Sequence, residues 1–287
     1  MKMLVETFTD TLTDTFSYVV HGEGQKACAV IDPVRGYDFR SGKTDTTGAD
    51  QILNFIARRG LQVEWLLETH MHADHLSSAA YIRDRAGGKI AASEKVKTVQ
   101  ALFGKLYNFE PAYYSAPGLF DYFFEAEESF TIGELPARAM YVPGHTPADL
   151  AYAVNDEAVF IGDTLFAPDL GTARCDFPGG DAEQLFASAQ RLLSLPAATQ
   201  LYLCHDYPPP GRERTSCVSV EVQRNKNIHV RPGGDKAAFV KLRHARDATL
   251  AMPNLLLPAL QVNIRGGSLP EPADNGKRYL KIPLDEG

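Results

Sequence analysis

Residues 69–75 read Thr-His-Met-His-Ala-Asp-His, and this stretch carries most of the information about the fold. It lies at the end of residues 63–70, an apolar run that we expect to form a buried strand and then a loop. His70 and His72 are two residues apart, so in an extended segment their side chains point to the same side. Asp74 and His75 lie where the loop turns into the next helix and approach the same point from another direction. Imidazole and carboxylate donors together suit a first-row transition metal.

Three single residues further along the chain support a common metal site. His145 lies in Val-Pro-Gly-His-Thr-Pro, Asp163 in Phe-Ile-Gly-Asp-Thr, and His205 in Leu-Cys-His-Asp-Tyr. Each follows an apolar run that we interpret as a strand, so the fold could gather all three at one edge of the sheets. Each residue alone could equally be a buried polar group whose hydrogen bonds are satisfied within the fold. Together with the first cluster, they predict a metal centre.

Composition excludes several other classes of protein. The 287 residues carry a net charge of −7, with 44% hydrophobic and 23% charged residues, which is ordinary for a soluble globular protein. No run approaches the ~20 apolar residues of a membrane-spanning helix, and Glu6 and Asp10 interrupt the start where a signal peptide needs an apolar stretch. An acidic chain without a basic block is a poor nucleic-acid binder. The four cysteines form no CxxC pair, so we expect reduced thiols in a cytoplasmic protein.

The order of elements favours an α/β fold, a four-layer αββα sandwich formed as a single domain over residues 1–287 with a C-terminal extension. Apolar alternation predicts strands, and Asn155-Asp156 is typical of a tight turn between two of them. Residues 100–135 are aromatic and irregular and are expected to form a long excursion, which could cover the site or form a subunit contact. The predicted strands are 2–8, 15–21, 26–34, 137–142, 150–154, 157–161 and 199–204. The predicted helices are 49–60, 77–85, 181–194, 217–226 and 235–249, followed by a tail with two Gly/Pro-rich turns.

The sequence resembles the metal signature of the metallo-β-lactamase superfamily over residues 70–205. This signature consists of HxHxDH, followed along the chain by a single His, a single Asp and a final His. The resemblance implies the αββα fold with the metal at one edge of the sandwich. In a two-metal hydrolase of this superfamily, a metal-bound hydroxide is the nucleophile. Carried over by position, the ligands of one metal would be His70, His72 and His145, those of the other Asp74, His75 and His205, and Asp163 would bridge.

The flanking residues look more like those of the persulfide dioxygenases, also called sulfur dioxygenases, and of the bacterial β-lactamase-like hydrolases among them. The motifs are Gly-Asp-Thr-Leu-Phe (162–166), Gly-Thr-Ala-Arg-Cys-Asp-Phe (171–177), Cys-His-Asp-Tyr (204–207) and the tail segment 253–263. In glyoxalase II the stretch that corresponds to 204–207 usually reads Gly-His-Glu-Tyr. The resemblance covers nearly the whole chain.

This resemblance implies that the protein oxidises glutathione persulfide with O2 to sulfite and glutathione, in sulfide detoxification. It implies one mononuclear Fe(II) per chain, held by His70, His145 and Asp163. It also implies a homo-oligomer, a dimer or tetramer, and a separate rhodanese-type sulfurtransferase for sulfur transfer. The alternative is a two-zinc hydroxyacylglutathione thioester hydrolase of the glyoxalase II type. In the iron enzyme, the polar groups at a vacant second metal site would be His72, Asp74, His75 and His205.

Other residues near these motifs are candidates for substrate contacts. Arg174 matches an arginine that the dioxygenase family places at the glutathione site, and its alternative role is an ion pair with Asp176. Tyr207 could reach the metal ligands through its hydroxyl or pack in the core, and Asp206 is expected to orient a ligand. Arg224 could bind the glutathione carboxylates or lie on a solvated basic face. Two cysteines beside these residues are either small buried groups or redox-active thiols: Cys175 and Cys204.

Overall fold

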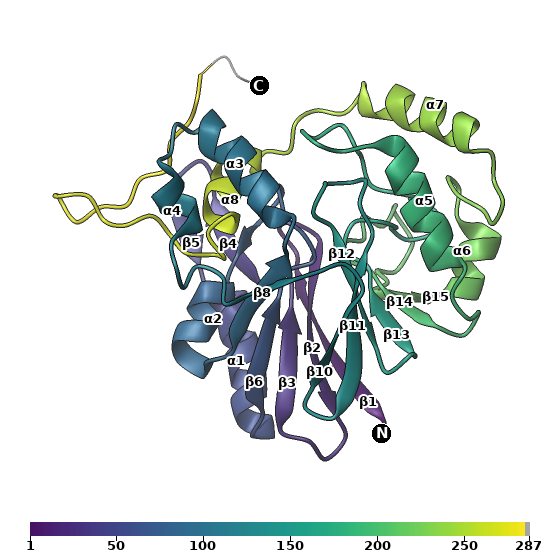
Figure 1. Ribbon diagram of the computed structural model, residues 1–287, viewed down its shortest axis with the longest axis horizontal. Coiled ribbons are helices and arrows are strands. Elements are labelled where there is room, and N and C mark those ends of the chain that lie inside the picture. The colour runs from purple at the N-terminus through teal and green to yellow at the C-terminus, as the bar shows by residue number, and fades with distance from the viewer. Residues whose placement is uncertain (285–287) are drawn as a thin grey trace.

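The computed structural model describes residues 1–284 as two six-stranded β-sheets that pack face to face (Figure 1). The first sheet has the order β1-β2-β3-β6-β8-β9, and the second runs in sequence order from β10 to β15. The strands of the first sheet are β1 (Met3–Asp10), β2 (Thr15–Gly22), β3 (Ala27–Ile31), β6 (Gln62–Leu67), β8 (Lys89–Ser93) and β9 (Tyr122–Phe124). The strands of the second are β10 (Glu128–Ile132), β11 (Leu135–Tyr141), β12 (Leu150–Val154), β13 (Ala158–Phe160), β14 (Gln200–Tyr202) and β15 (Cys217–Ser219).

Strand direction explains where the helices lie. The first three strands pair antiparallel, whereas β3, β6, β8 and β9 pair in parallel. Parallel neighbours need a crossover connection, and helices occupy these crossovers. In the second sheet the same holds for the parallel pair β13 and β14. The helices are α1 (Thr47–Arg59), α2 (Ala79–Ala86), α3 (Val96–Leu106), α4 (Pro111–Ser115), α5 (Ala182–Leu193), α6 (Val220–Lys226), α7 (Lys236–Asp247) and α8 (Leu256–Asn263).

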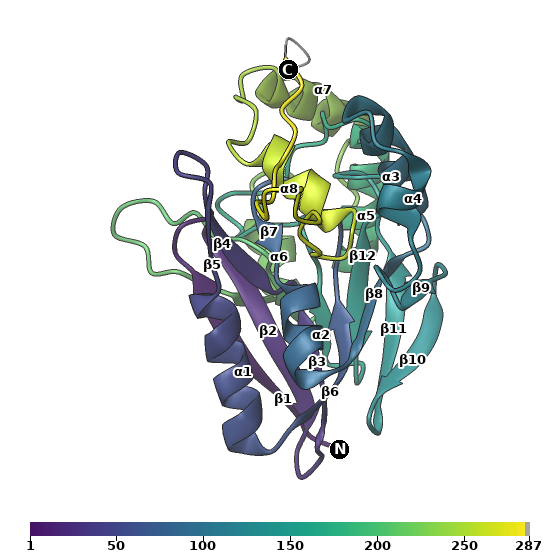
Figure 2. The ribbon, with the colours of Figure 1, turned by 90° about the vertical axis from the view of Figure 1, so that its left-hand side faces the viewer.

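Alternation along the strands separates the apolar core into layers. In β2, Val19 belongs to the cluster that contains Ile52 of α1, whereas its neighbour Tyr18 belongs to the cluster between the sheets. Tyr18 packs edge to face on Phe160 of the second sheet, with ring centroids 5.1 Å apart. A third cluster joins the second sheet to α5 through residues such as Leu185. Figure 2 shows α1 and α2 in front of the first sheet, on the face away from the second sheet. The predicted four-layer αββα sandwich is therefore confirmed.

Most predicted elements are found within two or three residues of their expected bounds, and the turn at Asn155-Asp156 is confirmed by positive φ angles of 55° and 52°. The prediction of an irregular excursion over residues 100–135 is wrong. This segment contains most of α3 and all of α4, β9 and β10. Val96, Val99 and Phe103 share one buried face of α3 and form the apolar repeat of an amphipathic helix. The predicted excursion began at residue 100, in the middle of this repeat, so the helix was not recognised.

Two further expectations need correction. Residues 217–226 begin as β15 and become helical only at Val220, because Cys217–Ser219 pair with Gln200–Tyr202. The tail contains α8, which was not predicted. Nearly all of its residues are buried, so no polar face marks the helical period.

A third, three-stranded sheet lies beside the end of β6. It has the order β5-β4-β7, with β4 (Val34–Asp38), β5 (Lys43–Asp45) and β7 (Leu76–Ser77). β7 follows the histidine-rich stretch directly, so its pairing with β4 ties this stretch to the chain after β3.

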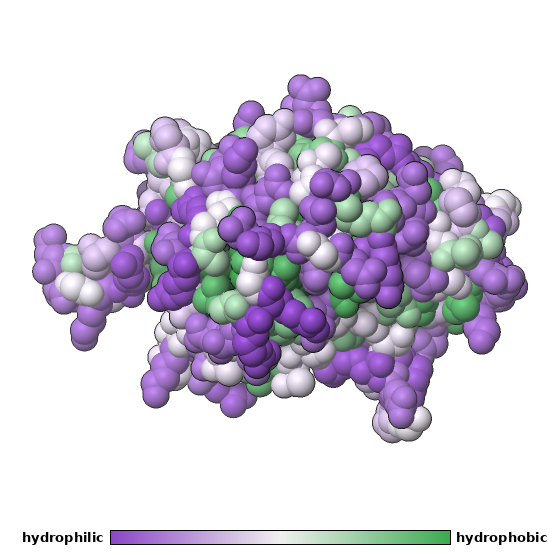
Figure 3. Space-filling view, turned by 90° about the horizontal axis from the view of Figure 1, so that it is seen from below, coloured by the Kyte–Doolittle hydropathy of each residue, from purple (hydrophilic) through white to green (hydrophobic). Residues whose placement is uncertain are grey.

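The face seen from below in Figure 3 is mainly hydrophilic, with smaller hydrophobic patches. Among residues 1–284, none of the helices combines the length and apolar character needed to cross a membrane.

Candidate metal centre

All of the predicted donors lie at the same edge of the sandwich. The stretch from His70 to His75 follows β6, His145 follows β11, Asp163 follows β13 and His205 follows β14. An isolated bridge between Thr15 and His205 joins the start of β2 to the end of β14 at this edge. The structure therefore gathers residues that are up to 135 positions apart in the sequence, as the strand ends predicted.

The donors form two sets that share Asp163. In the first set, the donor atoms of His70, His145 and Asp163 all lie within 4.8 Å of one another. The Asp163 carboxylate is 3.9 Å from Nε2 of His70 and 3.6 Å from Nε2 of His145. The second set consists of His72, Asp74, His75 and His205, again with donor atoms within 4.8 Å. In this second set, Nε2 of His205 lies 3.5 Å from the other carboxylate oxygen of Asp163.

Several of these donor atoms are buried without a hydrogen-bond partner among the described residues. Buried polar atoms in proteins are almost always paired, so such a group of unpaired atoms requires an explanation. Metal ions bound to the two donor sets would satisfy the carboxylate oxygens and the neutral imidazole nitrogens among them, which means that the residues fit a metal. The unpaired atoms are Nε2 of His70, Nδ1 of His72, Nε2 of His75, Nε2 of His205, Oδ2 of Asp74 and Oδ1 of Asp163.

Contacts on the other ring nitrogen fix the orientation of two imidazoles. Nδ1 of His145 donates to the carbonyl of Arg174 at 2.7 Å, and Nδ1 of His75 donates to the carbonyl of Leu76 at 3.2 Å. Because a carbonyl can only accept, Nδ1 carries the proton and Nε2 keeps its lone pair. Partners of this kind hold metal-binding histidines in the required tautomer.

His72 differs from the other histidines, because a carboxylate occupies one of its nitrogens. Its Nε2 lies 3.0 Å from Oδ1 of Asp32 and 3.7 Å from Oε2 of Glu68. Burial disfavours the charged imidazolium, but Asp32 and Glu68 outweigh burial and raise the pKa of His72 to about 9. Asp32 was not predicted as a site residue. The signal was available, since Asp32 ends an apolar strand as Asp163 does.

The protonation of His70, His75 and Asp74 suits a cation. Burial, together with the neighbouring imidazoles, holds the pKa of His70 well below its ordinary value and lowers that of His75 to about 4. Although burial disfavours the charge of Asp74, the imidazoles of His205 and His75 lower its pKa to about 2. At neutral pH His70 and His75 are thus neutral and Asp74 is ionised, the forms that ligate metals.

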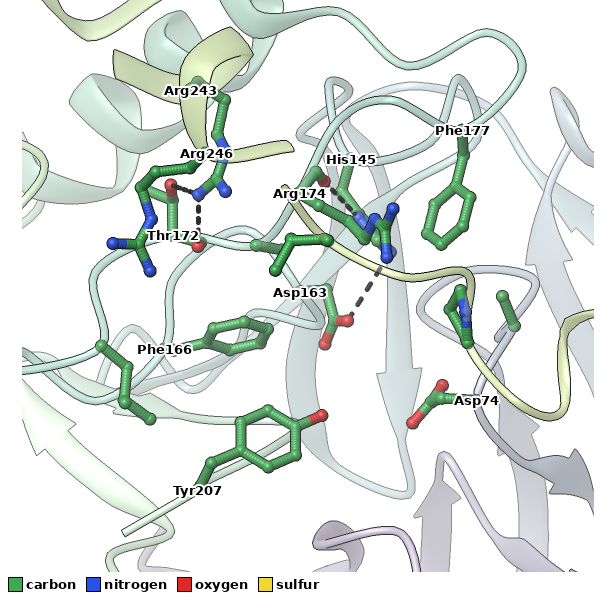
Figure 4. Close-up of a pocket in the computed structure, with 15 residues that line it drawn as sticks. Asp74, His145, Asp163, Phe166, Thr172, Arg174, Phe177, Tyr207, Arg243 and Arg246 are labelled. Atoms are coloured by element: carbon green, nitrogen blue, oxygen red, sulfur yellow. Dashed lines mark hydrogen bonds and ion pairs between the residues drawn. The ribbon is translucent and has the colours of Figure 1, made fainter. Parts of the chain in front are cut away.

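A pocket of about 340 Å³ opens above the first donor set (Figure 4). His145, Asp163 and Asp74 line one side of it, and Arg243 and Arg246 line another. Figure 4 shows the Tyr207 ring on the side opposite the two arginines, with its hydroxyl directed toward the carboxylates. The volume is in the range of pockets for small-molecule ligands. Neither Arg243 nor Arg246 was predicted, because on the helix 235–249 they read as an ordinary basic face.

Arg174 lies in this pocket, but its side chain is already engaged. Its Nε and one terminal nitrogen bind both carboxylate oxygens of Asp176, at 2.6 and 2.7 Å, and the other terminal nitrogen donates to the carbonyl of Ala251 at 2.7 Å. The ion pair with Asp176, one of the two predicted roles, is therefore present. The backbone carbonyl of Arg174 orients His145, which no sequence signal indicated.

Tyr207 and Asp206 are adjacent in sequence but have different surroundings. The Tyr207 ring stacks on that of His205, with centroids 5.7 Å apart and an 8° interplanar angle, and it is 43% exposed in the pocket. Asp206 was expected to orient a ligand. Its buried carboxylate instead accepts hydrogen bonds from Arg212 and from the backbone of Thr215, so it holds the loop after the site.

The structure does not bring Arg224 to the pocket. Its guanidinium donates to the carbonyls of Leu193 and Leu195, at 2.6 and 2.5 Å, and so satisfies carbonyls at the end of α5. The two cysteines are buried, and burial raises the pKa of Cys175 to about 12 and that of Cys204 well above its ordinary value. Buried thiols with raised pKa values are poor nucleophiles, which favours the packing role over the redox role.

The metallo-beta-lactamase superfamily profile matches residues 10–205, which include every donor described above. The chain belongs to this superfamily. A protein of Burkholderia pseudomallei described as a probable metallo-hydrolase is 51% identical, with 99% of each chain covered. Glyoxylase B2 of Dictyostelium discoideum is 44% identical, over 99% of this chain and 98% of that protein.

Other members of the superfamily agree with the predicted branch and fold. The beta-lactamase hydrolase-like protein of Agrobacterium fabrum is 49% identical over 98% of this chain, which matches 64% of that protein. The crystal structure of ETHE1 from Myxococcus xanthus has a TM-score of 0.73 and 24% identity, covering 92% of this chain and 100% of that one. This structure supports the metallo-beta-lactamase fold.

Proposed function

We propose that this protein is a persulfide dioxygenase that oxidises glutathione persulfide with O2, with one Fe(II) held by His70, His145 and Asp163. The observation that carries the proposal is the separation of the donors into two sets. The donor atoms of the three proposed ligands lie within 4.8 Å of one another beside the pocket, and Asp163 is the residue they share with the second set. His72 is grouped with the donors of the second set and its Nε2 is bound to Asp32. A triad of two histidines and a carboxylate is typical of non-haem iron oxygenases and leaves open positions for substrate and oxygen. The flanking motifs, which look like those of the persulfide dioxygenases, point the same way.

Bound iron would supply the redox chemistry that couples the outer persulfide sulfur to O2. Glutathione persulfide, O2 and water give glutathione, sulfite and two protons, so the reaction balances without a further reductant. The protein's part is to position the reactants. The Arg174 carbonyl orients His145, and Tyr207 faces the carboxylates across the pocket.

The cationic side of the pocket is suited to the carboxylates of glutathione. Arg243 is buried and already bound to Asp247 at 2.8 Å and to the carbonyl of Thr172 at 3.1 Å, so it shapes the wall. Arg246 lies one helical turn further along α7, is exposed and lines the same pocket. A guanidinium binds a carboxylate through two parallel hydrogen bonds. We assign Arg246 to a glutathione carboxylate.

The second candidate function is hydrolysis of a glutathione thioester at two zinc ions. It is favoured by the second donor set, in which Nε2 of His75, Nε2 of His205 and Oδ2 of Asp74 are buried and make no hydrogen bond. Nε2 of His205 lies 3.2 Å from Oδ2 of Asp74, so the two donors converge on one point. The similarity to the protein named Glyoxylase B2 is a further reason to keep this candidate.

One preparation of the protein, divided into two portions, can distinguish the two functions. Purified protein would be loaded with Fe(II) anaerobically, and a second portion with Zn(II). Each portion would be given glutathione persulfide in an oxygen electrode, with sulfite measured, and S-lactoylglutathione in a separate cuvette. We expect oxygen uptake matched by sulfite with iron only. Thioester hydrolysis by the zinc form without oxygen uptake by the iron form would favour the hydrolase and refute the dioxygenase.

A further inference from the structure

A second cavity, of about 270 Å³, lies away from the metal centre, and none of its lining residues lines the metal pocket. It opens to solvent and is bordered by β4, by α2 and by the chain after α8. Residues from each of these three segments meet in it, namely Arg35, Tyr81 and Ser268. We refer to it as the Arg35 cavity.

The innermost charged group of this cavity is Arg35. The side chain is only 7% exposed, yet its Nε has no hydrogen-bond partner among residues 1–284. Its guanidinium carbon lies 5.3 Å from the centre of the Tyr81 ring, a cation–π contact. Removing a charge from water costs several kcal/mol unless an opposite charge or good hydrogen bonds offset it. Arg35 lines the cavity, and its guanidinium makes no hydrogen bond or ion pair with the described residues, so its charge favours an anion in that cavity.

Backbone contacts hold the walls of the cavity in place. Arg35 itself pairs with Leu76 in the ladder between β4 and β7. On the opposite side, Gly267 has a φ of 80°, and a Cβ there would lie 3.0 Å from the carbonyl oxygen of Ser77. Only glycine lets the chain pass so close to β7 in this conformation. The cavity is thus part of the fold rather than a gap between mobile side chains.

The charges around Arg35 are mixed, and their burial decides which dominates. Arg278, Asp84 and Glu271 also line the cavity, but all three are exposed, so solvent screens their charges more than that of the buried Arg35. Arg83 also lines it, but it is bound to Asp121 at 3.3 Å. Burial lowers the pKa of Arg35; Tyr81 opposes this effect most, while the like charges of Arg85 and Arg278 add to it. The interior of the cavity is therefore cationic.

We propose that the Arg35 cavity is a binding site for a tetrahedral oxyanion, phosphate or sulfate. The Arg35 guanidinium would contact the anion at the inner end, with Arg278 and the Ser268 hydroxyl as further donors. A guanidinium presents its N–H groups in a planar fork that matches two oxygens of such an anion. The proposal does not depend on the reaction at the metal centre.

Isothermal titration of the full-length, metal-loaded protein tests this site, with sodium phosphate and sodium sulfate injected separately into a chloride buffer. We expect one anion to bind per chain and the affinity to fall at least tenfold in Arg35→Met. Arg40→Met is the matched control, because Arg40 is an exposed arginine beyond the same strand and should bind as the wild type does. Circular dichroism would establish that each variant is folded.

Arg278→Met provides a second variant, since Arg278 is exposed and its replacement should not affect folding. We expect it to weaken binding severalfold. Binding of phosphate but not sulfate, or the reverse, would support the site and identify its anion. No binding of either anion to the wild type would overturn the proposal, as would undiminished binding to both Arg35→Met and Arg278→Met, which would put the anion elsewhere, including at the metal centre.

Discussion

His70 and His72 have the same side chain, lie two residues apart and are both fully buried, yet the structure gives them different surroundings. Nε2 of His70 faces the Asp163 carboxylate across 3.9 Å without a hydrogen-bond partner. Nε2 of His72 is bound to Asp32 at 3.0 Å. Their alternation predicted that both would point to the metal edge. It could not predict Asp32, which is 40 positions away in the chain from His72.

This difference predicts opposite results for two substitutions. His145→Ala removes a member of the proposed triad and should abolish iron binding. His72→Ala should keep nearly the wild-type iron content but lower the free energy of unfolding by about 3–5 kcal/mol, because the buried Asp32 loses its cationic partner, although it keeps its hydrogen bonds from Thr69. Iron analysis of dialysed protein and urea unfolding measure the two effects. Full iron content in His145→Ala, or complete loss in His72→Ala, would mean that the ligands are assigned wrongly.

A second pair of substitutions tests the substrate side. Arg246→Ala should raise KM for glutathione persulfide about 5- to 10-fold with a smaller change in kcat, because an ion pair with a carboxylate is lost at an exposed position where solvent weakens it. Arg224→Ala is the control. Its guanidinium binds the carbonyls of Leu193 and Leu195, so stability should fall while KM stays unchanged. Equal effects of both substitutions on KM would remove Arg246 from the substrate site.

The metal donors could be predicted from the sequence because each follows a strand, and strand ends meet at an edge. The pocket residues could not. Arg243 and Arg246 come from a helix whose position over the site depends on the packing of α7 against α5, and neither residue belongs to a motif. Arg174 was found through the flanking motif, but its pairing with Asp176 shows that a motif identifies a position and not a contact.

Helices were predicted correctly where the amphipathic period agreed with residues that typically begin or end a helix. Helix α5 begins after Asp181, whose carboxylate accepts from the backbone N–H groups of Glu183 and Gln184. Helix α1 ends at Gly60 in the left-handed conformation. By contrast, α8 is buried on nearly all sides, and α3 lies in an aromatic segment. Ring contacts such as that between Phe109 and Tyr113, 4.1 Å apart, depend on tertiary packing that a local pattern does not contain.

The loop that carries Arg174 depends on a close contact at Gly171. This residue has a φ of 85°, and a Cβ there would lie 2.1 Å from Nδ1 of His229. Gly211 has a similar φ of 89° but open space around it. Gly211→Ala should therefore lower the free energy of unfolding by about 1 kcal/mol from backbone strain alone. Gly171→Ala should lower it by at least ~2 kcal/mol more, since the contact forces the loop or His229 to move. Equal losses in urea unfolding would contradict the contact.

His229 also makes this loop sensitive to acid. Burial, together with the charges of Arg246 and Arg243, lowers the pKa of His229 to about 4, and its Nδ1 accepts a hydrogen bond from the backbone N–H of Thr172. The folded protein keeps this imidazole neutral, whereas the unfolded chain takes up a proton below its ordinary pKa of 6.5. The free energy of unfolding should therefore decrease as the pH falls from about 6.5 toward 4, by on the order of 1–3 kcal/mol from this residue. Comparison of wild type with His229→Gln, whose side chain can still accept this bond, isolates the contribution, and equal slopes against pH would contradict it.

For the whole molecule, the order of strands and helices was enough to favour a four-layer sandwich, and the profile of the superfamily agrees with it. The metal centre joins the two halves of that sandwich. His70 belongs to the end of the first sheet, and Asp163 and His205 belong to ends of the second. A bound metal therefore links both sheets at one edge.

Removal of the metal should destabilise the whole fold. A ligand present at 100 times its Kd adds about 2.7 kcal/mol to the free energy of unfolding. We expect a chelator to lower Tm by several degrees and Fe(II) to restore it. The same treatment should leave Tm unchanged in Asp163→Ala, which has lost the residue shared by both donor sets. A wild-type Tm that does not respond to the chelator would contradict the role of the metal as a link between the sheets.

We propose that a single iron, held by His70, His145 and Asp163, is sufficient for the oxidation of glutathione persulfide. Stepwise anaerobic addition of Fe(II) to metal-free protein, followed by the rate of oxygen uptake with glutathione persulfide at each step, tests it most directly. We predict a linear rise in the rate that ends at one iron per chain, with sulfite formed in step with oxygen consumed. A rise that continues to two metals per chain, or no oxygen uptake at any iron content, would contradict the claim.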